Sequence, residues 1–169
     1  ESINGKVDVK TPVGGKVAEV LFKDGTMVEK GKPLVRFDTR QAQTNAATSK
    51  KLIELETTDL EDRLKILEGR EDVLKKKLAT NESITNELGK LVSAGGFQRI
   101  QYLQQLDELY ALRTELANIK LERNRTILES EKSIGRLTNQ LKQAELQLQY
   151  QNVLAPTSGI VFEPKARVD

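Results

Sequence analysis

A Gly-Gly pair interrupts a long helical pattern in the stretch LVSAGGFQRIQYL, residues 91–103. Between Asp38 and Asn152, 113 residues contain no proline and are rich in Leu, Glu, Lys, Gln and Ala, the good helix formers. Glycine costs about 1 kcal/mol in a helix interior and is favoured in the left-handed conformation just past a helix end. Gly95-Gly96 therefore predicts the end of one helix and a reversal of the chain.

Two arms of nearly equal length flank this break: Thr39–Ala94 has 56 residues and Phe97–Gln151 has 55. At ~1.5 Å per residue, each arm would be a helix of roughly 80 Å. Apolar residues recur in both arms at the heptad spacing of a coiled-coil seam. The seam positions are Ile53, Leu60, Leu64, Leu67, Leu74 and Leu78, then Leu109, Leu112, Leu116, Ile119, Ile127, Ile134, Leu137, Leu141, Ala144 and Leu148. We therefore predict an antiparallel helical hairpin.

Three positions in the arms predict irregularities. The step from Ile119 to Ile127 is eight residues, which predicts a slip of register near Arg123-Asn124-Arg125. Gly69 and Gly135 lie inside the arms and are candidate kinks.

Outside the arms the pattern is that of short strands. Valines from Val7 and Val9 onward are punctuated by turn signals such as Asp24-Gly25 and Gly31, so four strands are expected within residues 1–38. Strand character returns in Val153-Leu154-Ala155 and again in Ile160-Val161-Phe162.

The two β-segments echo each other, because TPVGGKV (11–17) and APTSGIV (155–161) both contain Pro-x-x-Gly-x-Val. Proline fixes φ and glycine can supply a strained turn residue. We expect Pro12, Gly15, Gly25 and Gly31, together with Pro156 and Gly159, to be the turns of two half-motifs. The prediction is an α+β fold with three parts: 1–38 and 152–169 (this half truncated as given) form one small β-sandwich, and 39–151 is the inserted hairpin, with its tip near 93–97.

Composition excludes several classes of function. The chain has no His and no Cys, which removes the commonest general base, metal ligand and nucleophile pairings. Its 27 Lys and Arg are interleaved with 25 Asp and Glu, so no basic stripe for nucleic acid is expected. Both Gly-Gly pairs lack a phosphate-binding context. Neither catalytic nor metal-binding nor cofactor-binding residues are predicted, and the chain is not expected to be an enzyme.

The run Pro12, Gly15, Val17, Gly25, Val28, Gly31, Leu34 and Asp38, with the return strand 153–162, resembles biotinyl/lipoyl domains and, more closely, the HlyD family of membrane-fusion proteins. A carrier domain would present a modified Lys between its halves. Phe37-Asp38-Thr39 occupies that place, so covalent cofactor carriage is not expected.

The resemblance implies a periplasmic adaptor of a tripartite transport system. Such an adaptor bridges an inner-membrane ABC exporter and an outer-membrane TolC-type duct, packs as a homo-oligomer, usually a hexamer, and is anchored to the inner membrane by a segment absent from this sequence. The polar turn favours type I secretion of proteins or peptides. A drug-efflux adaptor and a coiled-coil scaffold without a transport role are the alternatives.

The resemblance also implies that the hairpin tip docks to the duct. The expected tip residues are Glu87, Leu88, Leu91, Val92, Gly95, Gly96, Phe97, Gln98 and Arg99. Many family members carry Arg-x3-Leu-x6-Ser there; Leu91 matches, whereas Glu87 and Gln98 replace the Arg and the Ser. Alternatively, Leu91, Val92 and Phe97 form only a hydrophobic clasp at the turn. Ile100, Leu103 and Leu106 are expected in the seam.

Overall fold

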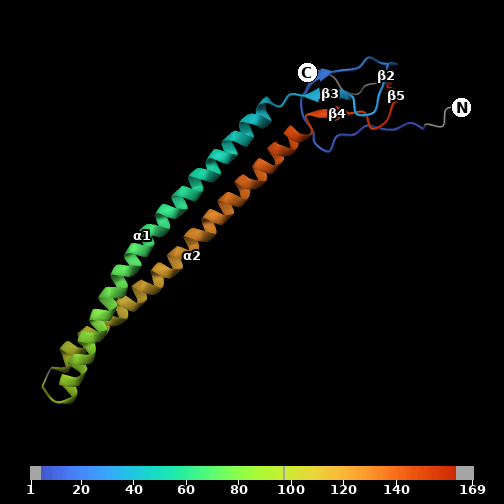
Figure 1. The fold of residues 1–169 in the computed structure, drawn as a ribbon. Coiled ribbons are helices and arrows are strands. Elements are labelled where there is room, and N and C mark those ends of the chain that lie inside the picture. The colour runs from blue at the N-terminus through green and yellow to red at the C-terminus, as the bar shows by residue number, and fades with distance from the viewer. Residues whose placement is uncertain (1–4, 97, 163–169) are drawn as a thin grey trace. The chain divides into compact units, whose positions relative to one another are not determined.

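The computed structural model describes residues 5–96 and 98–162. Along the chain, two long helices lie between two groups of short strands (Figure 1). The elements are β1 (Val17–Val20), β2 (Met27–Val28), β3 (Pro33–Phe37), α1 (Arg40–Ser93), α2 (Arg99–Gln149), β4 (Asn152–Leu154) and β5 (Gly159–Ile160). The chain divides into two compact units, Glu1–Ile53 with Arg136–Asp169, and Glu54–Gly135. We call the first the β-unit and the second the distal hairpin.

Strands from both ends of the chain pair in the β-unit. β3 is the central strand of an antiparallel sheet of order β1-β3-β4, and β2 pairs with β5 in a second, two-stranded sheet. Figure 1 shows β3 beside β4 although about 115 residues of chain separate them, a span that includes both helices. The predicted pairing of the two half-motifs is confirmed.

Backbone hydrogen bonds outside the strands extend this pairing. The amide of Gly31 donates to the carbonyl of Ala155 (2.9 Å), and the amide of Ala155 donates to the carbonyl of Lys32 (2.9 Å). The amide of Gly25 donates to the carbonyl of Val161 (2.7 Å). Gly25 and Gly31 have φ of 78° and 85°, which non-glycine residues rarely adopt, so both turns depend on glycine.

The core of the β-unit is small. Leu34, Val35 and Ala155 are buried together, one of them from the second half of the chain. Half-buried residues from both halves pack against these three, namely Val17, Phe22, Val28, Val153 and Val161. Such a small apolar core makes the backbone pairing between the halves important for the unit.

Two expectations about the strands are wrong in the described residues. Residues 5–16 form no strand, and Val7 and Val9 are exposed because no neighbouring strand covers them. Gly15 and Gly159 lack the positive φ expected of strained turn residues. A Cβ on Gly15 would lie 3.4 Å from the ring of Phe37, so this glycine lies directly beside that ring. Pro12 and Pro156 do lie in bends of the chain.

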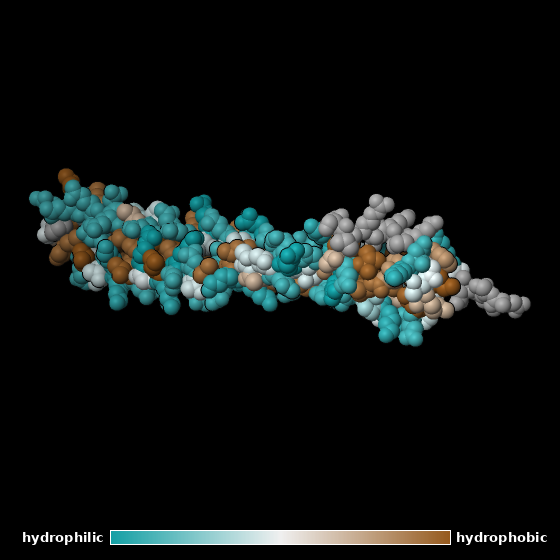
Figure 2. All heavy atoms as spheres, turned by 90° about the horizontal axis from the view of Figure 1, so that it is seen from above, coloured by the Kyte–Doolittle hydropathy of each residue, from teal (hydrophilic) through white to brown (hydrophobic). Residues whose placement is uncertain are grey.

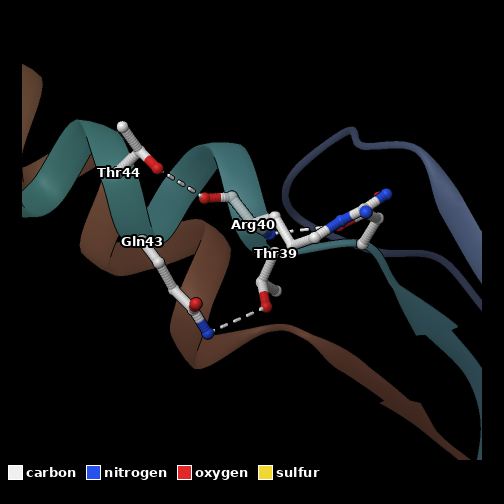
Figure 3. Close-up of polar contacts among 5 residues, drawn as sticks. Thr39, Arg40, Gln43 and Thr44 are labelled. Carbon is white, nitrogen blue, oxygen red and sulfur yellow. Dashed lines mark hydrogen bonds and ion pairs between the residues drawn. The ribbon is translucent and has the colours of Figure 1, made fainter.

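Side chains order the first turn of α1. The backbone amide of Arg40 donates to Oδ1 of Asp38 (3.1 Å), which satisfies one of the free donors at the helix start. Gln43 Nε2 donates to Thr39 Oγ1 (3.5 Å), and Thr44 Oγ1 donates to the carbonyl of Arg40 (3.1 Å), as Figure 3 shows. These contacts stabilise the first turn of α1 directly after the end of β3.

In the distal hairpin, α1 and α2 run antiparallel and bury residues at alternating steps of three and four, which is the coiled-coil pattern. Leu67, Leu74, Leu109 and Ile119 are buried apolar seam residues. Polar residues occupy further seam positions: Glu71, Asn81, Thr85 and Ser130 are buried as well.

The expected slip of register near Arg123-Asn124-Arg125 is not observed. α2 is continuous, and from Leu109 to Ser130 its buried and half-buried positions keep the three-four spacing through Arg123 and Thr126. Arg123 belongs to the seam because its Nη2 lies 3.4 Å from Oε2 of the buried Glu71. A heptad pattern of apolar residues alone omits the polar seam positions Arg123 and Thr126. The next apolar residue after Ile119 in that pattern is Ile127, so the step appears to be eight residues.

Candidate docking site at the hairpin turn

The reversal between the helices is built by hydrogen bonds of the last turn of α1. The amide of Gly96 donates to the carbonyl of Leu91 (2.9 Å), and the amide of Gly95 donates to the carbonyl of Val92 (3.0 Å). This pair of bonds, with Gly95 at φ 77°, is a Schellman motif. The helix therefore ends at Ser93, as the Gly-Gly pair predicts.

The tip residues divide into buried and exposed groups. Leu88 and Val92 are half-buried and face the seam, whereas Leu91 is 47% exposed. Glu87, Gly95, Gly96, Gln98 and Arg99 are exposed. Phe97 lies outside the described residues. Leu91 is thus available for contact with a partner, whereas the alternative of a hydrophobic clasp also involves Phe97 and lies partly outside the described residues.

Two residues expected in the seam face solvent. Ile100 is 70% exposed and Leu103 is 48% exposed, while Leu106 is half-buried. The seam of α2 instead begins with Tyr102, which packs on α1, so Ile100 and Leu103 lie outside the seam. Exposed apolar side chains at the tip are therefore more numerous than the sequence pattern indicated.

A close helix approach near the tip was missed by the sequence analysis. A Cβ on Gly89 would lie 3.3 Å from Cε2 of Tyr102, so glycine lets the tyrosine ring rest on α1. An open groove beside this contact is lined by Thr85, Asn86, Gly89, Lys90, Ser93, Ala94 and Tyr102. A glycine opposite an aromatic at equal distance from the turn is the signal that could have revealed it.

The described tip carries charges of both signs. Lys90 Nζ lies 3.4 Å from Oε1 of Glu87, on the exposed surface of α1. Arg99 adds a positive charge at the start of α2. The tip therefore offers apolar side chains within a mixed polar rim, an arrangement found at protein interfaces.

The marked pKa shifts lie elsewhere. Hydrogen bonds from the side chain and backbone of Arg40 lower the pKa of Asp38 to about 2, and the pKa of Arg40 is raised by the same pair. In the seam, the hydrogen bond from Lys75, supported by the charges of Lys75 and Arg123, lowers the pKa of Glu71. Both carboxylates are held charged by cations and serve the structure of the helices.

Two further observations concern the described residues as a whole. No group of three or more His, Cys, Asp and Glu side chains is placed to hold a metal ion in the described part of the chain. Among residues 5–96 and 98–162, neither helix combines the length and apolarity needed to cross a membrane.

Comparison with known proteins gives similar folds but no close relative. No family model and no curated protein matches this chain. MacA from Actinobacillus actinomycetemcomitans superposes with a TM-score of 0.48 at 24% identity, covering 99% of this chain and 44% of MacA. The periplasmic adaptor protein EmrA superposes with a TM-score of 0.45 at 19% identity, covering 95% of this chain and 67% of EmrA.

A third similar structure is the soluble domain of LipC, a membrane fusion protein of a type I secretion system. Its TM-score is 0.37 at 13% identity, over 94% of this chain and 92% of LipC. This chain spans less than half the length of the MacA structure. Of these three structures, EmrA is a periplasmic adaptor protein and LipC is a membrane fusion protein.

Proposed function

We propose that this chain is the periplasmic part of a tripartite transport adaptor, in which a lipoyl-like β-domain carries a helical hairpin. The three-part division at 1–38, 39–151 and 152–169 is part of this proposal. The Pro-x-x-Gly-x-Val echo supports it, as does the arrangement of two small sheets around the core of Leu34, Val35 and Ala155.

The observation that carries the proposal is the pairing of β3 with β4 and of β2 with β5 across the whole hairpin. A free-standing coiled-coil scaffold predicts that residues 1–38 and 152–169 are independent of each other. That expectation is wrong, because hydrogen bonds join the two ends at Gly25 and Gly31. A helical hairpin inserted into one β-unit is the architecture that the adaptor family uses to reach a distant partner.

At the tip, the proposal assigns docking to an outer-membrane TolC-type duct. Leu91, Ile100 and Leu103 support it, because they are large, apolar and exposed next to the turn. Glu87 and Gln98 replace the Arg and Ser of the family motif, so the duct surface should differ from one that recognises that motif.

The remaining parts of the proposal follow the family resemblance. The inner-membrane partner is an ABC exporter, the adaptor is anchored to that membrane in the periplasm, and copies assemble as a homo-oligomer, usually a hexamer. Type I secretion is preferred to drug efflux because the stretch 95–103, rich in Gly, Gln and Arg, is more similar to the secretion branch of the family.

The proposal includes no catalysis and no cofactor. The position of a carrier lysine is occupied by Phe37-Asp38-Thr39, and Asp38 there bonds the first turn of α1. The chain would act by holding partners together, with energy supplied by the exporter.

Photo-crosslinking in cells tests the tip. A photoreactive amino acid replaces Leu91 or Gln98, both exposed, and the control replaces exposed Lys65 in the middle of α1. Mass spectrometry then identifies the captured protein. The proposal expects an outer-membrane duct from positions 91 and 98 and none from position 65. Capture of the duct from position 65 alone would contradict tip docking.

A further inference from the structure

The first turn of α2 exposes two large apolar side chains, Ile100 at 70% and Leu103 at 48%. Figure 2 shows apolar side chains at the surface of the helices among the hydrophilic ones. Residues three apart in a helix lie on the same face, so Ile100 and Leu103 form one apolar edge. The hydrophobic effect favours turning this edge toward α1, out of water. Its exposure therefore requires a contact that holds it outward.

Tyr102 occupies the seam position in place of this edge. It lies seven residues before Leu109, which is 5% exposed, and so continues the heptad series of α2. Each residue turns the helix by about 100°, so Ile100 lies roughly 160° and Leu103 roughly 100° from Tyr102 around the axis. Rotation of the first turn by about one residue would place Leu103 in the seam, with Ile100 and Leu106 about 60° to either side. Burial of the ring and burial of the edge are thus alternatives.

Gly89 of α1 makes the room that the ring needs. A Cβ on Gly89 would lie 3.3 Å from Cε2 of Tyr102, 3.4 Å from its hydroxyl oxygen and 3.5 Å from Cζ. An alanine there would be tight, and a larger side chain would take the place of the ring. A Cβ on Gly69, in the same helix, would meet nothing within 4 Å. The close approach is therefore a property of position 89 and not of every glycine in α1.

The backbone holds the first turn of α2 only loosely. The amide of Tyr102 donates to the carbonyl of Gln98 over 3.4 Å, whereas backbone hydrogen bonds usually measure about 2.9–3.0 Å. The first amides of a helix also lack partners within the helix. The packing of the tyrosine ring therefore has a large part in setting how this turn is rotated.

We propose that Gly89 and Tyr102 are positioning residues of the docking site: the ring seated on Gly89 keeps Ile100 and Leu103 outside the seam and available to a partner. Leu91, two residues after Gly89, lies level with Ile100, two residues before Tyr102 on the antiparallel helix. The edge thus adds to the exposed Leu91 at the same end of the hairpin. The duct as partner of this edge rests on the proposed function, whereas the packing of the ring does not depend on it.

Hydroxyl-radical footprinting of the purified chain, read by mass spectrometry, measures the exposure of these side chains without replacing them. Gly89→Leu is compared with Gly69→Leu, the same substitution in the same helix where space is open. Leucine favours helix more than glycine does, so α1 should stay intact in both variants, which circular dichroism verifies. Tyr102→Ala removes the ring and Tyr102→Phe keeps it, which gives a second matched pair.

Oxidation of Ile100 and Leu103 should fall several-fold in Gly89→Leu and in Tyr102→Ala, and oxidation of Tyr102 should rise in Gly89→Leu. The controls Gly69→Leu and Tyr102→Phe should keep the parent pattern at Ile100 and Leu103. Fraying of the turn would instead raise oxidation at all three positions. That result, or a pattern unchanged in Gly89→Leu, would overturn the proposal.

Capture of the duct separates this role from docking itself. With the photoreactive residue at position 98, capture should fall several-fold in Gly89→Leu and stay at the parent level in Gly69→Leu. Equal capture in both variants would overturn the positioning role. If the parent chain captures no duct while the footprint changes as expected, docking is wrong and the control of the edge by Gly89 stands. Capture by the parent with an unchanged footprint leaves docking and removes the role of Gly89.

Discussion

The β-unit and the distal hairpin are stabilised in different ways. Around the strands of the β-unit, three residues form the buried apolar cluster, and backbone hydrogen bonds join segments from the two ends of the chain. In the distal hairpin, a long seam repeats the same contacts and includes the polar Glu71, Asn81 and Thr85. A repeated seam can tolerate a polar position, whereas a core of three side chains has no such redundancy. A substitution of a core residue should therefore reduce stability more in the β-unit than in the distal hairpin.

The largest effect is expected for Leu34→Ala. Leu34 is 5% exposed at the centre of the small core, and its loss should cost about 2–4 kcal/mol in free energy of unfolding. Hydrogen exchange should show loss of amide protection at Leu21, Phe37 and Ala155, while helical circular dichroism is retained.

The matched control for Leu34→Ala is Met27→Ala, at a residue 68% exposed in β2, with an expected change below about 0.5 kcal/mol. Equal effects of the two variants, or collapse of helical signal with Leu34→Ala, would contradict the separation of the two regions.

Two glycine substitutions compare the turn of the hairpin with the interior of α1. Gly95→Ala forces an L side chain into φ 77° and should destabilise by about 1–2 kcal/mol. Gly69→Ala lies inside α1 with open space around its Cβ and should stabilise by about 1 kcal/mol. Thermal unfolding followed by circular dichroism measures both. Shifts of the same sign would refute this account of the turn.

A smaller effect is expected at Ser130. Its Oγ is buried without a hydrogen-bond partner in the described part of the chain. Ser130→Ala removes this unsatisfied group and improves helix propensity, so it should stabilise by about 0.5–1 kcal/mol. Denaturant unfolding tests this, and a loss of stability would show that the hydroxyl contributes to the seam.

The smallest effect is expected for the dependence of the melting temperature on low pH. The pKa of Asp38 is lowered to about 2 by its hydrogen bonds with Arg40, and that of Glu71 is lowered first by its bond with Lys75. A carboxylate with a lowered pKa stabilises the fold above its unfolded pKa and loses that contribution as the pH falls through the folded value. Melting temperatures should therefore decline below about pH 4.5.

Asp38→Asn and Glu71→Gln should each flatten this decline, and Glu131→Gln, at an exposed site of α2, should not. Identical acid profiles for all three variants would exclude a role for these two pairs.

Sequence patterns predicted the large features because these depend on local chemistry. The reversal at Gly95 follows from glycine alone, and the pairing of the halves follows from a repeated motif. The missed features depend on neighbours distant in sequence. Val7 and Val9 favour a strand, but no other strand lies beside them.

Seam composition and the outer surface were harder to predict for a related reason. Arg123 enters the seam only because Glu71 lies opposite, and an apolar heptad search cannot detect that pair. Ile100 and Leu103 fit heptad spacing as written, yet Tyr102 takes the inner position because Gly89 leaves space for its ring. Contacts with the other helix therefore decide which of these nearby apolar residues lies in the seam.

The most direct test of the account is a disulfide between the two ends of the chain. Met27 and Ile160 are partners in the β2–β5 pair, and Cα atoms so paired lie within the range that a disulfide can bridge. In the Met27→Cys, Ile160→Cys double variant, mild oxidation should give a monomer with an internal disulfide and intact helices. Thiols that stay free, or that link only different molecules, would contradict the claim that a helical hairpin joins two halves of one β-unit.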